Sequence, residues 1–402
     1  MTRTLFRGGS VFDGTGAPPV PADVLIDGSR ITEVGPDLTG EVTIDVTGKT
    51  LLPGMFDCHV HVTGSGLDLP TRLELPFSYQ FYAAMRNLDA TLACGITSAR
   101  DAEGADLGIQ LAQERGDIKG PRLQIAISMI SQTGGHGDGW RASGNHFLYS
   151  LPYPGRPDGI ADGPDEVRRK VRELLRAGAG VIKVCTTGGV LSSRDDPRHR
   201  QFSPAELSIM VEEAAAQGRS VMAHATSPEG IMNAVRAGAR SIEHGTILDD
   251  AAIELMAQAG TWLVPTLSAG HFLLRMADEG MRISPNALAK ARQMTDVHRE
   301  SVARAYAAGV KIAMGTDSGV TPHGENLTEL QLMAQAGMSP ADVLVAATSS
   351  AAELLGVADD RGTIAPGKRA DLVVVDGDPY DFAALKGAIT DVYQDGVRVH
   401  GR

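Results

Sequence analysis

Short apolar runs rich in β-branched residues recur through the middle of the chain, and a glycine opens or precedes each of them. The clearest are GITSARD, AGVIKV, ARSIEHG and GVKIAMGTD, and each follows a helix-like stretch. A glycine just past a helix end permits the left-handed turn that leads into the next strand. Runs of this kind are typical of strands buried on both faces in a parallel sheet. The alternation therefore predicts repeated βα units.

Polar residues stand at the carboxyl ends of these predicted strands, where the sequence places Arg100, Asp101, Lys183, His244 and Asp317. In a (β/α)8 barrel this is the face on which active sites are built. A doubly wound open sheet would explain the alternation equally well, but it would not gather so many strand ends around one point. We therefore predict an α/β fold whose main part is a (β/α)8 TIM barrel.

Both ends of the chain have a different pattern. Residues 1–54 and 358–402 contain alternating or apolar strands such as VLIDG, ITEVG, DLVVVDG and VRVHG, separated by Gly, Pro and Asp turns. Such segments are typical of β-hairpins. Neither end is long enough to form a convincing core alone. We expect the two ends to combine into one small β-sandwich against a barrel that spans residues 55–357.

The composition limits the partners and the location. The formal charge of −12 argues against a nucleic-acid surface, because phosphate binding requires clustered Lys and Arg. No apolar run approaches the roughly 18 residues of a membrane span, and the first residues lack the apolar segment of a secretory signal. Cys58, Cys94 and Cys185 show no CxxC spacing, which favours reduced core thiols. We expect a cytoplasmic protein with small-molecule partners and no nucleic-acid or membrane partner.

Histidines close several of the predicted strands. His59 and His61 stand in FDCHVH, and residues i and i+2 of a strand point the same way, so that both imidazoles can converge on one metal ion. His224 in VMAHATS and His244 in SIEHGT each close a separate apolar strand. One such histidine is usually part of the core, but two on successive strands of a barrel would face the same mouth. This arrangement favours a metal site.

A lysine and an aspartate complete the candidate set. Lys183 lies in the apolar strand VIKVCTTGG, where an unpaired ammonium would be costly. It is either an amine that extends to the barrel mouth or pairs with a carboxylate, a Schiff-base lysine, or a lysine carboxylated by CO2 that bridges two metals. Asp317 ends the last predicted barrel strand, where its carboxylate could ligate a metal and accept a proton from water.

The ordered set HxH, Lys, His, His, Asp resembles that of the binuclear metal-dependent amidohydrolases, and in particular their imidazolonepropionase-like and prolidase-like (Xaa-Pro dipeptidase-like) branch. LLPGMFDCHVH, TGGHGDG, HATSPEGIMNAVRAGARSIEHGTIL, MGTDSG and GTIAPGKRADLVVVDGDP carry the resemblance, which covers essentially the whole chain. These motifs are specific for the superfamily and its metal site and much less specific for the substrate.

The resemblance implies a two-metal site. His59, His61 and Asp317 would hold the more buried ion and His224 and His244 the more exposed one, and a CO2-derived carbamate on Lys183 would bridge them. These ligands suit Zn²⁺, although Mn or Co could occupy a similar geometry. Water between the ions would be activated to hydroxide and would attack the C–N bond of a small-molecule amide.

Two residues outside the metal set take their roles from the same resemblance. Asp317 would accept the proton of the water and deliver it to the leaving amine. His136, in the loop TGGHGDG over the predicted barrel mouth, would polarise the scissile carbonyl, although a loop-capping role is the alternative. His271, His323 and the loop arginines Arg141 and Arg194 are weaker candidates for the pocket border.

The substrate stays open at this stage. An N-acyl amino acid, a dipeptide or a related aryl amide, carbamate or urea is the first hypothesis, and a cyclic amide is the nearest alternative. Prolidase-like relatives tend to carry Tyr where this chain has Thr226, which puts dipeptidase activity in doubt. Three other hypotheses leave some or all of the six candidate ligands without a role. They are mononuclear deamination, a non-catalytic binding protein on the same barrel and a Schiff-base aldolase. We also expect residues 131–163 to form part of a lid or pocket wall, and the protein to form homo-oligomers.

Overall fold

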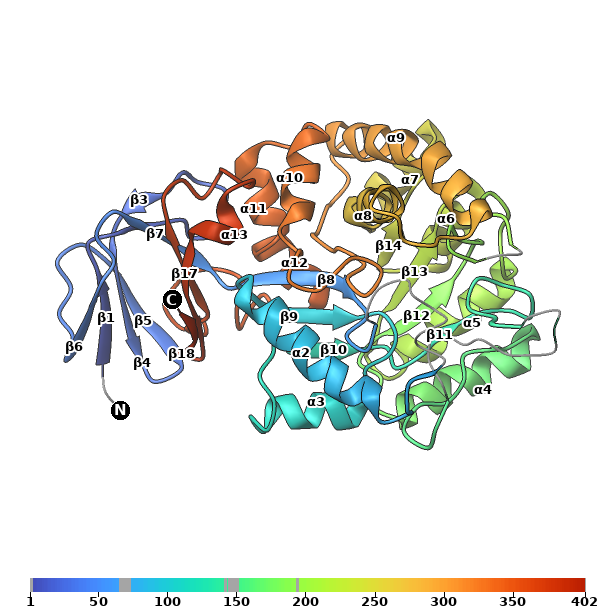
Figure 1. The fold of residues 1–402 in the computed structure, drawn as a ribbon, viewed down its shortest axis with the longest axis horizontal. Coiled ribbons are helices and arrows are strands. Elements are labelled where there is room, and N and C mark those ends of the chain that lie inside the picture. Colours follow the sequence, from blue (N-terminus) through green and yellow to red (C-terminus); the bar gives the residue numbers. More distant parts are fainter. Residues whose placement is uncertain (1–2, 65–73, 141–142, 144–151, 193–194, 402) are drawn as a thin grey trace.

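The computed structural model describes residues 3–64, 74–140, 143, 152–192 and 195–401. Strands from both chain ends lie together at one end of the molecule (Figure 1). One sheet has the order β5-β4-β1-β6, with bounds Arg30–Gly35, Asp23–Asp27, Arg3–Arg7 and Val42–Asp45. The other has the order β18-β17-β16-β7-β2-β3, with bounds Val397–Gly401, Ile389–Gln394, Leu372–Asp376, Lys49–Pro53, Ser10–Val11 and Val20–Pro21.

Apolar side chains of the two sheets share one buried cluster. Phe6 and Ile26 of the first sheet pack in it with Leu51 and Val374 of the second. The Phe6 ring meets that of Tyr393 edge to face, with centroids 4.9 Å apart. Since β7 precedes and β16 follows the central part of the chain, this core joins residues that are more than 300 positions apart in the sequence.

The central part of the chain alternates parallel strands with helices, which confirms the predicted α/β class. One parallel sheet has the order β10-β9-β8, with bounds Arg122–Ile125, Ile96–Asp101 and Met55–Val60. The other has the order β11-β12-β13-β14-β15, with bounds Met129–Ile130, Ile182–Cys185, Val221–Ala225, Ser241–His244 and Trp262–Val264. β10 and β11 are separated in the chain by residues 126–128 alone.

Helices surround these parallel strands (Figure 1). Their bounds are Tyr79–Ala93 (α2), Leu107–Glu114 (α3), Gly163–Arg176 (α4), Pro204–Ala215 (α5), Pro228–Ala237 (α6), Asp250–Ala259 (α7), Leu267–Asp278 (α8), Pro285–Ala307 (α9), Thr328–Gln335 (α10), Pro340–Ala346 (α11) and Ser349–Leu355 (α12), whereas Leu385–Ala388 (α13) packs on β16 and β17. The predicted turn between helix and strand occurs at Gly238, which ends α6 with a φ of 96°. This left-handed conformation is one that glycine adopts without strain.

The run GVKIAMGTD differs from its prediction, because it forms isolated bridges and no regular strand. Ile312 bridges to Leu263 of β15 and Ser318 bridges to Val60 of β8, both in parallel. Cys58 also donates its backbone N–H to the carbonyl of Met314, with N and O 2.9 Å apart. This segment therefore contacts one edge strand of each parallel sheet.

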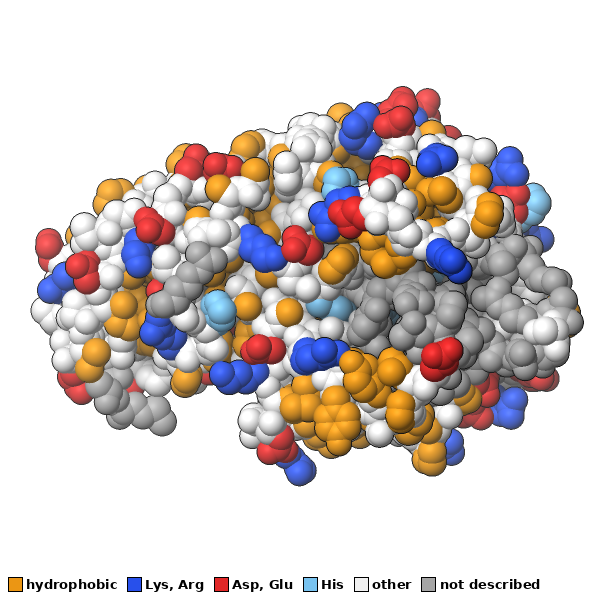
Figure 2. Space-filling model, in the orientation of Figure 1, with side chains coloured by type: hydrophobic (Ala, Val, Ile, Leu, Met, Phe, Trp, Pro, Cys, Tyr) orange, Lys and Arg blue, Asp and Glu red, His pale blue; other side chains and the backbone are white. Residues whose placement is uncertain are grey.

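The charge distribution on the surface and the state of the cysteines match what the composition predicted. Lys and Arg lie among Asp and Glu without gathering into one patch on the face drawn in Figure 2. None of the helices in the described ranges combines the length and the apolar character that crossing a bilayer requires. Cys58, Cys94 and Cys185 are buried free thiols, as predicted.

Candidate metal centre

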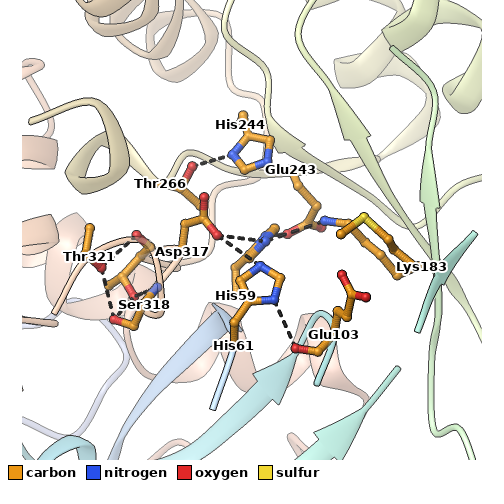
Figure 3. A network of polar contacts seen from close by, with 12 residues as sticks. His59, His61, Glu103, Lys183, Glu243, His244, Thr266, Asp317, Ser318 and Thr321 are labelled. Carbon is orange, nitrogen blue, oxygen red and sulfur yellow. Dashed lines mark hydrogen bonds and ion pairs between the residues drawn. The ribbon is translucent and has the colours of Figure 1, made fainter. Parts of the chain in front are cut away.

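The six predicted metal ligands lie around one pocket at the carboxyl ends of the parallel strands. They are His59 on β8, His61 directly after it, Lys183 on β12, His224 on β13, His244 at the end of β14 and Asp317 after the bridging segment. The pocket has a volume of about 160 Å³. Figure 3 shows His59, His61, Lys183, His244 and Asp317 converging from these separate elements.

The distances are short enough for shared metal ligation. Donor atoms of His59, His244 and Asp317 all lie within 4.8 Å of one another. Asp317 Oδ1 lies 3.1 Å from His61 Nε2 and 3.6 Å from His59 Nε2. Lys183 Nζ lies 3.5 Å from His59 Nε2. Imidazole nitrogens and a carboxylate oxygen that converge in this way form a donor set suited to zinc.

Each candidate histidine has one ring nitrogen in contact with a protein group outside the candidate ligand set. These contacts join His59 Nδ1 to Glu243 Oε2 (2.7 Å), His61 Nδ1 to the Glu103 carbonyl (3.0 Å), His224 Nε2 to the Gly188 carbonyl (3.1 Å) and His244 Nδ1 to Thr266 Oγ1 (2.6 Å). Metal-binding histidines usually have such a second partner, which fixes the tautomer and the ring orientation. The remaining nitrogens are Nδ1 of His224 and Nε2 of the other three rings, and those of His59 and His61 face the candidate ligands Lys183 and Asp317.

Burial keeps most of these imidazoles neutral. Loss of hydration lowers the pKa of His59, His224 and His244 well below the ordinary value for imidazole. Burial also lowers the pKa of the Lys183 ammonium, although the nearby Glu243 carboxylate opposes the effect. A metal ligand has to be deprotonated, and a neutral amine is the form that can react with CO2. Burial thus favours the protonation states that ligation requires for these three histidines and Lys183, whereas the hydrogen bond to Asp317 raises the pKa of His61 against its burial.

Asp317 keeps its charge in the same surroundings. Burial acts to raise its pKa, but the hydrogen bond from His61 and the proximity of the His59, His61 and Lys183 side chains hold the pKa well below its usual range. The residue adopts a left-handed φ of 59°. Such a conformation is uncommon for a residue with a side chain and occurs disproportionately at functional sites.

A buried ion pair behind His59 was not anticipated from the sequence. Glu243 is fully buried, and its Oε1 accepts a hydrogen bond from Arg100 Nη2 at 2.9 Å while its Oε2 faces His59. Arg100 also donates from Nε to the carbonyl of Cys58 at 2.7 Å. The sequence offered a signal for this contact, since Glu243 is a charged residue within an apolar strand and directly precedes His244.

A Glu243→Gln variant is expected to bind metal more weakly. The uncharged amide oxygen would stabilise the Nδ1–H form of His59 less than the carboxylate does, and weakening such a partner typically lowers metal affinity about 10- to 100-fold. Competition with a chromophoric chelator measures the affinity, and the exposed Glu254→Gln on α7 is the control. Unchanged metal affinity in a folded Glu243→Gln protein would contradict the assignment.

A second buried carboxylate, Asp57, joins the two segments that carry the ligands. Its oxygens accept hydrogen bonds from the His59 backbone N–H at 3.1 Å, the Thr316 hydroxyl at 2.6 Å and the Asn326 side chain at 2.8 Å. Burial raises the pKa of Asp57 to about 6, against the lowering effect of these hydrogen bonds. Asp57 thereby fixes the HxH segment relative to the residue that precedes Asp317.

His136 reaches the pocket from its glycine-rich loop. Its ring stacks on that of His224 with centroids 4.2 Å apart and planes 14° apart. Its Nδ1 lies 3.1 Å from Ser192 Oγ. A Cβ at Gly189 would lie 2.1 Å from His136 Cε1, so the stacked position requires glycine there.

A Gly189→Ala variant is therefore expected to displace the His136 ring. A misplacement of about 1 Å can lower activity about 100-fold, and we expect kcat/KM to fall by about 10- to 100-fold. Steady-state kinetics and a crystal structure of the variant measure the two effects. Gly35→Ala is the matched control, because a Cβ at Gly35 would meet no atom within 4 Å. Equal kinetics of both variants would show that the position of His136 has no role in turnover.

The weaker candidates lie in different places. His271 is exposed, and the His323 Nε2 atom contacts the backbone carbonyl of His61 at 3.1 Å without lining the pocket. The Thr226 hydroxyl lies at the pocket but is bonded to Thr187 Oγ1 at 3.0 Å. Arg141 and Arg194 lie outside the described residues.

The predicted lid, residues 131–163, also falls partly outside the described ranges, because 141–142 and 144–151 are not described. Among its described residues, His136 lines the pocket. Tyr153 instead packs edge to face on Phe77 and Phe81, near α2, with centroids 5.2 and 5.9 Å apart. The lid therefore stays a prediction.

Comparison with known proteins places the chain in a family. The model of the amidohydrolase family matches residues 50–401. Ochratoxinase from Aspergillus niger is 35% identical, over 98% of this chain and 86% of its own, and its crystal structure superposes with a TM-score of 0.88. A prolidase structure complexed with N-methylphosphonate-L-proline is 36% identical, covers 100% of both chains and gives a TM-score of 0.92.

Imidazolonepropionase from Methylobacterium nodulans is a more distant relative, 27% identical over 86% of this chain and 84% of its own. Together with the prolidase structure, it confirms the branch that the motifs predicted. These findings favour a hydrolase over the aldolase and the non-catalytic binding protein. The chain belongs to the amidohydrolase family and is a hydrolase that acts on carbon–nitrogen bonds.

Proposed function

We propose that this protein hydrolyses an exocyclic amide bond in a small molecule, such as an N-acyl amino acid, a dipeptide or a related aryl amide or carbamate, at a two-metal centre. The observation that carries the proposal is the convergence of four histidines, each with one ring nitrogen already bonded to the protein, on Asp317 and the buried Lys183. A structural role alone would not require four oriented imidazoles around one pocket.

The residues present fit a binuclear centre. We assign His59, His61 and Asp317 to one ion, His224 and His244 to the other, and a carbamate on Lys183 to both, with zinc as the metal that suits these donors. Since a donor atom of His244 also lies within 4.8 Å of donors of His59 and Asp317, the two sets are adjacent. Bound there, the ions would polarise the scissile carbonyl and acidify water.

The protein side chains would supply proton transfer and orientation. Asp317 Oδ1 lies against the rings of His59 and His61, so we assign proton acceptance, and delivery to the leaving nitrogen, to Oδ2. His136, held by stacking on His224 and by Ser192, would donate a hydrogen bond to the substrate carbonyl. The Thr226 hydroxyl is bonded to Thr187 and takes no part in this scheme.

We further propose that the two parallel sheets close into the (β/α)8 barrel of residues 55–357, with residues 1–54 and 358–402 as the composite β-sandwich. The bonds of segment 311–318 to both β8 and β15 support closure on one side. We also propose a cytoplasmic, self-associating protein without nucleic-acid or membrane partners. Light scattering after size exclusion tests the self-association.

Metal analysis of protein purified without chelator, combined with a substrate panel, tests the function. The panel contains N-acyl amino acids, Xaa-Pro and other dipeptides, aryl amides and a cyclic imidazolone. About two divalent ions per chain together with cleavage of an open-chain amide are expected. Cleavage of the imidazolone alone would establish the cyclic-amide alternative, and absence of both metal and activation by zinc with bicarbonate would overturn the proposal.

A further inference from the structure

The pocket has two unlike walls. One is formed by the candidate ligands, and the other is rich in apolar side chains of the loop after β12 and of helices α8 and α9, with Thr295 and His298 of α9 as its polar members. This second group, the apolar wall, consists of Val190, Leu191, Ala269, Leu273, Ala291 and Met294. Leu273 and Ala291 are each only 2% exposed. The mechanism proposed above assigns no role to any of these side chains.

Lys290 on α9 connects the helices of the apolar wall to the loop after β12 through hydrogen bonds. Lys290 Nζ donates to the backbone carbonyls of Gly189 (3.0 Å), Ser192 (3.0 Å) and Asp195 (2.8 Å). An ammonium has three N–H donors, so these contacts use its full donor capacity on a single loop. The Lys290 side chain is 13% exposed and also lies 3.7 Å from Asp195 Oδ1.

The position of Lys290 links these contacts to the pocket. On α9 it directly precedes Ala291 and lies four residues before Met294, and both of those side chains line the apolar wall. The loop that it holds carries residues 190–191 into the same wall. Lys290 therefore fixes the distance between the two halves of the wall.

We infer that the apolar wall binds an uncharged apolar group of the substrate, aryl or branched alkyl, beside the scissile amide, and that Lys290 is the positioning residue of this subsite. The inference rests on the proposed function, because the metal centre would hold the amide. The six side chains of the apolar wall border the same pocket as the candidate ligands, so a group held against them lies next to an amide held at the metal centre. A charged group against the six apolar side chains would lose hydration without gaining a charged partner from them.

A matched pair of hydroxamates tests the subsite without any turnover. Acetohydroxamate and benzohydroxamate carry the same metal-binding head and differ in the apolar group alone. Calorimetry on the metal-loaded protein is expected to show about 10- to 100-fold tighter binding of benzohydroxamate, the gain typical of burying a ring of this size. Equal binding would overturn the apolar wall alone. Failure of both compounds to bind would overturn the metal centre and this inference with it.

Two variants test the apolar wall and the positioning role of Lys290 separately. Met294→Gln preserves length and introduces a polar group, and Lys290→Met removes the three donors. Both are expected to reduce the preference for benzohydroxamate several-fold while the affinity for acetohydroxamate and the metal content stay unchanged. Lys290→Arg should restore part of the preference, and the exposed Lys119→Met is the control. A Lys290→Met protein that keeps the full preference would refute the positioning role.

Discussion

A Lys183→Ala variant is expected to lose bound metal and activity together. Lys183 is 3% exposed, its Nζ lies 3.5 Å from His59 Nε2, and it lines the same pocket as His224 and His244. Without the bridging group the two ions would lose their shared ligand and would repel each other inside a buried site. We expect less than half of the wild-type metal content and a loss of kcat/KM of at least about 1000-fold, equivalent to several kcal/mol of transition-state stabilisation.

Chemical rescue makes this prediction specific for a carbamate. Acetate or propionate can enter the space left by the deleted side chain and supply the two oxygens of the missing bridge, so either acid should restore measurable metal binding and activity. The wild-type protein reconstituted with ¹³C-bicarbonate should show a carbamate signal in the ¹³C NMR spectrum that the variant lacks. Lys311→Ala, which removes a surface ion pair with Glu353, is the control. A Lys183→Ala protein with full metal content would contradict the bridging role.

The positions of the candidate ligands could be predicted because strand alternation and chain order carry them. A parallel strand that turns polar at its carboxyl end places that residue at a common face, whatever the loops do. This is why Lys183, His224 and His244 were expected around one mouth, where the structure places them. Free buried thiols and the pairing of strands from both chain ends follow from equally local patterns.

The contacts that orient the ligands could not be predicted in the same way. The bond from His59 to Glu243 joins residues 184 positions apart, and the stacking of His136 on His224 depends on the course of two loops. Such contacts depend on side-chain rotamers and loop conformation, which a periodic pattern does not encode. The conformation of the segment before Asp317 was not predictable either. This segment forms isolated bridges in place of a regular strand, and its Thr316 hydroxyl bonds to Asp57.

The second large effect is expected for Asp317→Asn. The amide oxygen of Asn can still face His61 and ligate a metal, but the side chain can no longer accept and return a proton. General acid–base catalysis typically contributes about 100- to 10,000-fold, so kcat should fall by that factor while KM and metal content change little. Asp296→Asn, at a position whose side chain is 86% exposed, is the control for the loss of one negative charge.

The leaving group distinguishes proton delivery from metal ligation at Asp317. An alkyl amine is strongly basic and must be protonated as the C–N bond breaks, whereas p-nitroaniline leaves with little help. If Asp317 delivers the proton, the loss of kcat in Asp317→Asn will be about 10-fold or more smaller for a p-nitroanilide than for the matching alkyl amide. If Asp317 acts through the metal alone, the loss will be the same for both amides, because the attack on the carbonyl would be slowed equally.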